Sequence, residues 1–171
     1  MAKVNANHIA SAQGGGTPQG ANHWAIEIEG LGGGGAEVIV LALDSSNAPQ
    51  ETQEELELKY GNETRYYAGG VTFESMSLTV RDFIDMDVVD ILEAWRNQAY
   101  DPETGNVGYP SEYKKSAHFI MLDSKGIETR RWELEGVWCS ALNRGAVSMD
   151  DAAVVKVEAT IRYDKMLRPT A

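Results

Sequence analysis

A run of glycines near the N-terminus has the spacing of a phosphate-binding loop. The stretch from Gly30 to Gly35 matches the G-x-G-x-x-G pattern of dinucleotide sites and follows a predicted strand. In such sites the pyrophosphate binds at the N-terminus of a helix that comes next. Residues 37–43 are instead apolar and rich in β-branched side chains, which predicts another strand. We therefore interpret the glycines as a loop and expect no cofactor.

Histidine and cysteine are the next residue types that could support chemistry. His8, His23 and His118 are widely scattered along the chain, so they do not suggest a metal site. Cys139 is the only cysteine, and it could act as a nucleophile if a hairpin placed it beside His118. A lone cysteine after Trp138 is more often a small buried apolar residue. We expect no metal and no disulfide.

Carboxylates are abundant, with 26 acidic residues against 15 basic ones. Some pair of them could resemble a glycosidase dyad, but an acidic surface explains their number equally well. Asp101, Glu103 and Asn106 surround Gly105 without the spacing of an EF-hand loop, and the chain has no G-x-S-x-G motif. The sequence therefore predicts a protein that is not an enzyme.

The length and net charge of the chain limit which other classes of protein it can belong to. A chain of 171 residues suits one domain, and its net charge of −11 disfavours binding to nucleic acid phosphates. No apolar run approaches the roughly 18 residues of a membrane span, and the N-terminus lacks an apolar signal core. We expect residues 1–22 to be a flexible Gly-rich arm that orders on assembly, and residues 23–171 to be a single β domain made in the cytoplasm.

The first half of the domain shows the periodicity of strands. Residues 24–29 alternate as a half-buried strand does, and residues 37–43 form an apolar run typical of a strand covered on both faces. Residues 44–55 are expected to form a long polar loop, and residues 56–60 alternate again before a turn at Gly61-Asn62.

A third alternating run, residues 71–81, is opened by Gly69-Gly70. Apolar and hydroxyl side chains separate cleanly between its two faces. One face carries Met76, Leu78 and Val80, and the other carries Ser75, Ser77 and Thr79.

The period then changes from two to that of a helix. Val88, Ile91, Leu92 and Trp95 recur at i, i+3, i+4 and i+7, which predicts a helix over about residues 86–99 with one apolar stripe. Asp85 or Asp87 can cap its N-terminus, and Pro102 prevents it from continuing.

The second half of the chain returns to strand patterns. The expected elements are a loop over 101–115, a hairpin of strands 117–122 and 127–138 with a turn at 123–126, a connection over 141–149, and a strand over 152–164. These elements predict a mainly β fold: an antiparallel β-sandwich or barrel with one flanking α-helix, which packs over a sheet or plugs a barrel end.

Many aromatic side chains lie in or beside the predicted loops and hairpins. Core packing explains about half of such residues, and exposed ones are favoured anchors at protein interfaces. The set comprises Tyr66, Tyr67, Tyr100, Tyr109, Tyr113, Trp132 and Trp138.

Four stretches in this order resemble the tail tube proteins of contractile-tailed bacteriophages. They are residues 71–78 leading to the helix that ends at Trp95-Arg96-Asn97, the loop 100–115, the strand 132–138 closing on Gly136-Val137-Trp138, and the final strand 157–164. The resemblance covers roughly residues 70–165, and the fold is shared with the hemolysin-coregulated tube proteins of type VI secretion.

The resemblance implies a structural subunit of a viral tail tube in the virion. Six copies would form a ring, their strands would join an inter-subunit β-barrel, and stacked rings would conduct DNA into the host without binding it specifically. The implied partners are further copies, the tail sheath, the baseplate and tail terminator proteins, and the tape measure protein. A type VI or pyocin-like tube is an alternative, and a small ligand-binding β-barrel is a second one.

Polar faces of the alternating strands are the candidates for lining the bore of such a tube, although bulk solvent would suit them almost equally well. The candidates are Glu27, Glu29, Glu57, Ser75, Ser77, Thr79 and Glu158.

Overall fold

The computed structural model describes residues 19–31, 35–147, 149 and 153–168; of residues 35–38 it describes the backbone only. The predicted arm therefore lies outside the described residues except for its last four. The strands are β1 (Trp24–Ile28), β2 (Leu43–Ser46), β3 (Glu51–Tyr60), β4 (Glu63–Phe73), β5 (Met76–Arg81), β6 (Lys115–Leu122), β7 (Glu128–Asn143), β8 (Lys156–Arg162) and β9 (Lys165–Leu167). The helices are α2 (Gly35–Ala42), α3 (Val88–Ala99) and α4 (Pro110–Tyr113).

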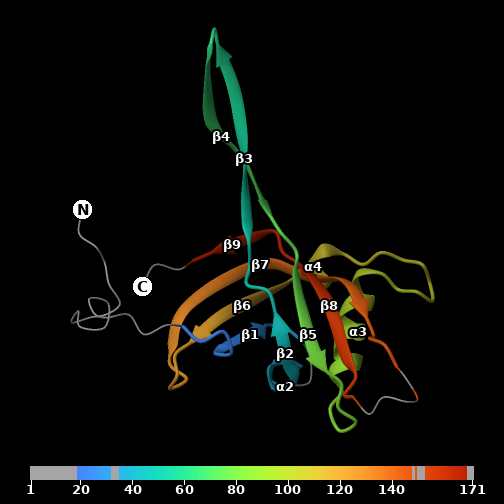
Figure 1. The fold of residues 1–171 in the computed structure, drawn as a ribbon. Coiled ribbons are helices and arrows are strands. Elements are labelled where there is room, and N and C mark those ends of the chain that lie inside the picture. The colour runs from blue at the N-terminus through green and yellow to red at the C-terminus, as the bar shows by residue number, and fades with distance from the viewer. Residues whose placement is uncertain (1–18, 32–34, 148, 150–152, 169–171) are drawn as a thin grey trace, which may run out of the picture.

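Seven strands form one antiparallel sheet, and the other two form a separate hairpin. The order within the sheet is β1-β6-β7-β8-β5-β2, and β9 pairs with the first half of β7. Within the described residues, β3 and β4 pair only with each other, and they stand away from the body (Figure 1). The predicted mainly β, antiparallel fold with a flanking helix is confirmed, and the sheet remains open because β1 and β2 each have one unpaired edge within the described residues.

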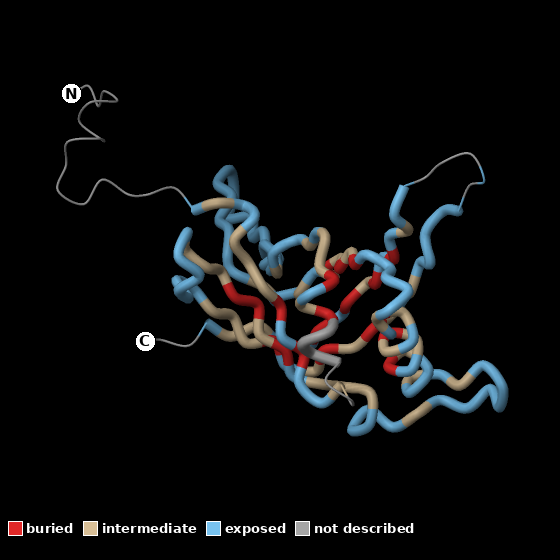
Figure 2. The backbone as a smooth tube through the Cα atoms, turned by 90° about the horizontal axis from the view of Figure 1, so that it is seen from below, coloured by how far each residue is buried: buried red, intermediate tan, exposed pale blue. Residues whose placement is uncertain are grey.

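The core lies where the sheet folds over helix α3. Met76, Leu78 and Val80 of β5 are buried, as their alternation predicts. In α3, Val88, Leu92 and Trp95 are buried, while Ile91 is half-buried against the same core. The helix packs mainly on β7, so it covers a sheet and does not plug a barrel. Figure 2 shows that the buried segments gather in the middle of the body, with exposed loops around them.

The predicted helix is confirmed: it begins two residues later than expected, at Val88, and ends at Ala99 as expected. Asp87 occupies the N-cap position, but its side chain makes no capping hydrogen bond. Trp95 anchors the helix, since its Nε1–H donates to the carbonyl of Tyr113 at 2.8 Å and its side chain is only 2% exposed. Burial of a large aromatic side chain with its polar atom satisfied is strongly stabilising.

The apolar run at residues 37–43 is not a strand, so that prediction is wrong. Residues 35–42 form helix α2, and only Leu43 belongs to a strand, β2. Short apolar runs fit either structure. Here Ile39 and Ala42 are buried three positions apart, which is the spacing of one helix face, whereas Leu41 is 69% exposed.

The predicted loop over residues 44–55 is also wrong for most of its length. Strand β2 continues to Ser46 and β3 begins at Glu51, leaving only residues 47–50 as a connection. Residues 51–55 carry no apolar periodicity because neither face of the hairpin is covered by the body. Gly69 and Gly70 do not open a strand either; they lie inside β4, where they form a bulge opposite Glu54.

Strand β7 does not end at Trp138 but continues to Asn143, so the predicted connection begins three residues too early. Gly136 lies in the middle of β7 with φ +67°, a conformation that favours glycine. Near this residue the partners of the strand change: the part before it pairs with β6 and β9, and the part after it pairs with β8. The last predicted strand is shorter than expected, starting at Lys156, and β9 follows it after a break at Tyr163 and Asp164.

Candidate functional site

The hairpin of β3 and β4 is the most unusual surface of the molecule. All ten residues of β3 are exposed, and in β4 only Gly69 and Phe73 are partly covered. Register pairing runs from Glu51 opposite Phe73 to Tyr60 opposite Glu63, with the turn at Gly61-Asn62 as predicted. A two-stranded hairpin is marginally stable in water without a third strand or a packed face. In the monomer this hairpin therefore lacks the third strand or packed face that would stabilise it.

One face of the hairpin exposes a cluster of apolar side chains, beside Arg65 and Glu63 on β4. Leu56, Leu58 and Tyr60 alternate along β3, so they share a face, and Tyr67 lies opposite Leu56 on β4. Their exposed fractions are 53%, 48%, 55% and 46%, respectively. Contiguous exposed apolar side chains of this kind mark interaction sites.

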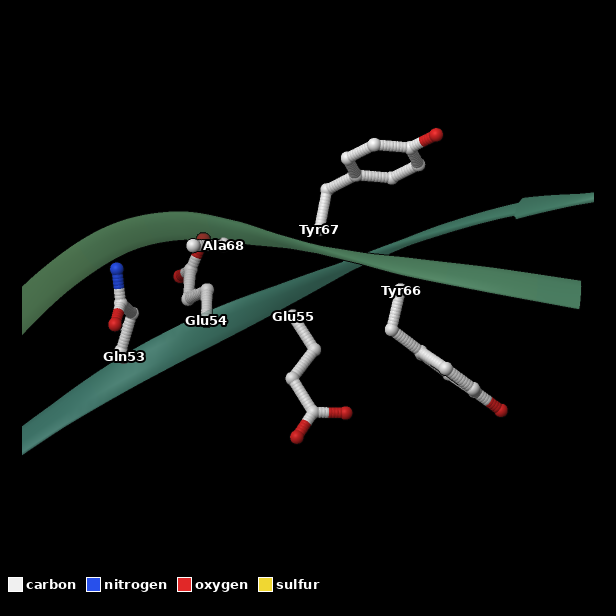
Figure 3. A pocket seen from close by; sticks show the side chains of 6 residues that line it. All are labelled: Gln53, Glu54, Glu55, Tyr66, Tyr67 and Ala68. Atoms are coloured by element: carbon white, nitrogen blue, oxygen red, sulfur yellow. The ribbon is translucent and has the colours of Figure 1, made fainter.

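The opposite face of the hairpin is more polar. Figure 3 shows Tyr66 and Glu55 pointing to the other side of the ribbon from Tyr67. Glu57 and Lys59 share that polar face and form an ion pair at 3.9 Å. Because both side chains are largely exposed, this pair contributes little stability. The six side chains of Figure 3 line a hollow from opposite sides of a two-stranded ribbon, so they do not enclose a ligand cavity.

The bore candidates predicted from the sequence fall into separate groups. Ser77, Thr79 and Glu158 share the outer face of β5 and β8, where Thr79 lies directly opposite Glu158. Glu27 and Glu29 lie at β1, at the other end of the strand order, and Glu57 lies on the hairpin. Ser75 is half-buried in the connection between β4 and β5. The fold therefore brings together only the first group.

An ion cluster joins three strands beside this group. Asp44 of β2 accepts from Arg81 of β5 at 2.7 Å and from Lys156 of β8 at 2.8 Å. These two cations, Lys156 foremost, lower the pKa of the Asp44 carboxyl below its ordinary value. The cluster ties the edge strand β2 to the sheet.

The residues considered for catalysis are separated by the fold. Cys139 is buried, its Sγ–H donates to the Ala141 carbonyl, and burial raises its pKa to about 11. His118 lies 3.3 Å from Glu29 instead of beside the thiol. A buried thiol with a raised pKa is a poor nucleophile. Among the residues that the structure describes, no group of three or more His, Cys, Asp or Glu side chains could hold a metal ion.

The glycine-rich loop needs a correction. A helix, α2, does follow it, so the expectation of a strand after the loop was wrong. However, β1 pairs antiparallel with β6, and β2 pairs antiparallel with β5. A dinucleotide site needs two parallel strands joined by the helix. The described strands do not supply that arrangement.

The exposure of Leu56 and Leu58 differs from the sequence prediction, because an alternating pattern such as that of residues 56–60 is typical of a half-buried strand. The aromatic signal did point to this region, because Tyr66 and Tyr67 are exposed on β4. Tyr100 and Tyr109 are also exposed, but they lie beside helices α3 and α4. Tyr113, Trp132 and Trp138 are half-buried against the body. In the described part of the chain, no helix has the length and apolar character needed to cross a membrane.

Comparison with known proteins gives one sequence relative and many similar folds. No protein-family model matches the chain. The tail tube protein of Serratia phage KSP90 is 24% identical over 160 residues, covering 90% of this chain and 88% of the relative.

Three solved structures illustrate the similarity of fold. A chain of the sheath-tube complex of the PVC extracellular contractile injection system aligns with a TM-score of 0.69 at 12% identity, over 99% of this chain and 100% of its own length. A chain of the anti-feeding prophage tube-terminating cap aligns at 0.71 and 12% identity, covering 91% and 93%. The SPP1 tail tube aligns at 0.58 and 11% identity, covering 88% and 78%. The chain is thus a homologue of a phage tail tube protein and has the fold of contractile injection system tube proteins.

Proposed function

We propose that this protein is the structural subunit of a phage tail tube, with copies arranged as hexameric rings that stack into a hollow conduit for DNA. The observation that carries the proposal is the hairpin of β3 and β4, which exposes an apolar face and pairs with no other described strand. A partner that covers this face would complete a sheet that is unfinished in the monomer.

Open strand edges support self-assembly. The outer edges of β1 and β2 are unpaired among the described strands, so their backbone groups are available to neighbouring copies. β2 leads into β3 and β4 leads into β5, so the hairpin continues the β2–β5 pair beyond the body (Figure 1). In the proposed ring these strands join those of adjacent copies in a continuous inner barrel, which removes the free edges.

The proposed bore face is the outer face of β5 and β8, with Ser77, Thr79 and Glu158 as its lining residues. It lies on β5, which the hairpin continues, and on its neighbour β8, whereas Glu27 and Glu29 lie at the edge strand β1 at the other end of the same sheet. Six copies at −11 each carry a formal charge of −66, which would discourage adhesion of DNA phosphates to the tube. Salt limits that repulsion to a range of about 8–10 Å.

The proposed partners are those of a tail: a sheath around the tube, baseplate and terminator proteins at its ends, and the tape measure protein and then DNA inside. Assembly would take place in the host cytoplasm, and the mature location would be the virion. The fold similarity to chains of extracellular contractile injection systems supports a second candidate, the tube of such a particle, which would carry a protein cargo in place of a genome.

Electron microscopy of the purified full-length chain tests the proposal. Rings or tubes with six-fold symmetry, growing with protein concentration, are the expected result. A species that sediments as a monomer at high concentration, even with tail initiation complexes added, would refute it. Particles purified from infected cells distinguish the two candidates, because the phage tube should be joined to a DNA-filled capsid.

A further inference from the structure

The hairpin joins the body at a root made of two short connections. Residues 47–50 lead from β2 into β3, and residues 74–75 lead from β4 into β5. Tyr163, which directly follows β8, reaches this root from a position 113 residues away from Gln50 along the chain. Its hydroxyl accepts from the Gln50 backbone N–H at 3.0 Å and donates to the Gln50 carbonyl at 2.9 Å. One side chain thereby satisfies both backbone groups of a root residue.

The Tyr163 ring also contacts the other strand of the hairpin. Phe73, the last residue of β4, lies with its ring centroid 5.8 Å from that of Tyr163, at an interplanar angle of 46°. Phe73 is paired with Glu51, the first residue of β3, and the Glu74 N–H donates to the Gln50 carbonyl at 3.1 Å. Tyr163 is only 5% exposed. The phenol therefore links both legs of the hairpin to the C-terminal end of β8.

Beyond the root, no other described strand pairs with the hairpin. Its residues from Thr52 to Thr72 pair only across the hairpin itself, and β3 is exposed along its whole length. Ten residues at about 3.3 Å each span about 33 Å, so a rotation of about 10° at the root moves the tip by about 6 Å. The backbone conformation at the root therefore sets the direction in which the exposed apolar face points.

We propose that Tyr163 is a positioning residue: its two hydrogen bonds to Gln50 and its ring contact with Phe73 set the direction of the hairpin in the free subunit. The link between this direction and tube formation rests on the proposed function. A subunit with a preset hairpin loses less conformational entropy when a second copy docks, which favours association. The positioning role itself is a property of the monomer and can be measured there.

The positioning role of Tyr163 can be tested by measuring the distance between the hairpin tip and the body in the full-length monomer. Spin labels at Asn62→Cys in the hairpin turn and Ser124→Cys in the exposed turn after β6 report hairpin direction, and the buried Cys139 stays unlabelled. We expect a narrow distance distribution in the parent and a broader, shifted one after Tyr163→Phe, which keeps the ring and removes the hydroxyl. Tyr109→Phe, at a tyrosine that is 75% exposed, is the control and should leave the distribution unchanged. An unchanged distribution in Tyr163→Phe would overturn the proposal.

A second measurement needs no variant. Amide hydrogen exchange of the parent monomer should show the Gln50 N–H protected, because it is bonded to the Tyr163 hydroxyl. Exchange of Gln50 at the rate of an open amide would overturn the proposal even if Tyr163→Phe fails to fold. If Tyr163→Phe broadens the distances while the parent never polymerises, the positioning role stands and the proposed tube function fails.

Discussion

Leu56 and Tyr67 face each other directly across β3 and β4, and both are about half exposed, at 53% and 46%. A cross-strand apolar pair normally stabilises a sheet by packing against a covered face. On this hairpin no described residue covers the pair, and the strands extend well beyond the core (Figure 1). The pair therefore belongs to the exposed surface that we propose a neighbouring copy covers.

Removing the apolar face should impair assembly without unfolding the subunit. We expect Leu56→Ser with Leu58→Ser to raise the concentration needed for polymer about tenfold or more, because interface anchors of this kind contribute over about 1 kcal/mol each. Thermal unfolding should change little, since both side chains lie outside the core. Sedimentation across a concentration series is the measurement. Lys59→Gln on the opposite face is the control, and equal polymer yield from the double variant and this control would contradict the expectation.

Trp95 should be the most costly residue of helix α3 to truncate. It is buried among the core residues, and its Nε1–H bonds the Tyr113 carbonyl. Trp95→Ala should lower the free energy of unfolding by about 3–5 kcal/mol. Urea denaturation followed by circular dichroism checks this value. Trp95→Phe retains most of the ring and should cost clearly less, so similar losses in both variants would show that cavity formation is not the cause.

Gly136 should not tolerate a side chain. Its φ of +67° disfavours L residues, and an added Cβ would lie 2.2 Å from Oδ2 of Asp164. Gly136→Ala should destabilise by more than the roughly 1–2 kcal/mol expected from backbone conformation alone. Gly126→Ala is the matched control, because Gly126 has φ +78° with no atom near the added Cβ. Equal losses in the two variants would exclude a steric contribution at Gly136.

Acid should weaken the attachment of strand β2. Because Lys156 and Arg81 lower the folded-state pKa of Asp44, the carboxylate stabilises the fold above its unfolded pKa. That contribution is lost as the pH falls through the lowered folded pKa. The difference in unfolding free energy between the parent and Asp44→Asn should therefore be largest near neutral pH and shrink below about pH 4. A difference that stays constant from neutral to strongly acidic pH would refute the linkage.

Local periodicity in the sequence determined a substantial part of this fold. The alternation of Met76, Leu78 and Val80 and the helical stripe from Val88 to Trp95 both match the buried residues of the structure. These patterns are reliable because the backbone geometry of a strand or helix imposes a repeat on every side chain that faces a core. The tube-protein fold was indicated differently, by the resemblance of four ordered stretches between residues 71 and 164 to tail tube proteins, and the fold similarity agrees with it.

Tertiary structure decided the features that have no such repeat. The apolar run at residues 37–43 fitted both a strand and a helix, and packing of Ile39 and Ala42 on the body selected the helix. The first half of β3 carries no apolar signal, because its partner strand supplies hydrogen bonds but no buried face. The contact of Tyr163 with Gln50 joins positions 113 residues apart. Only folding of the intervening chain brings such positions together, since a one-dimensional pattern contains no information on the distance between distant segments.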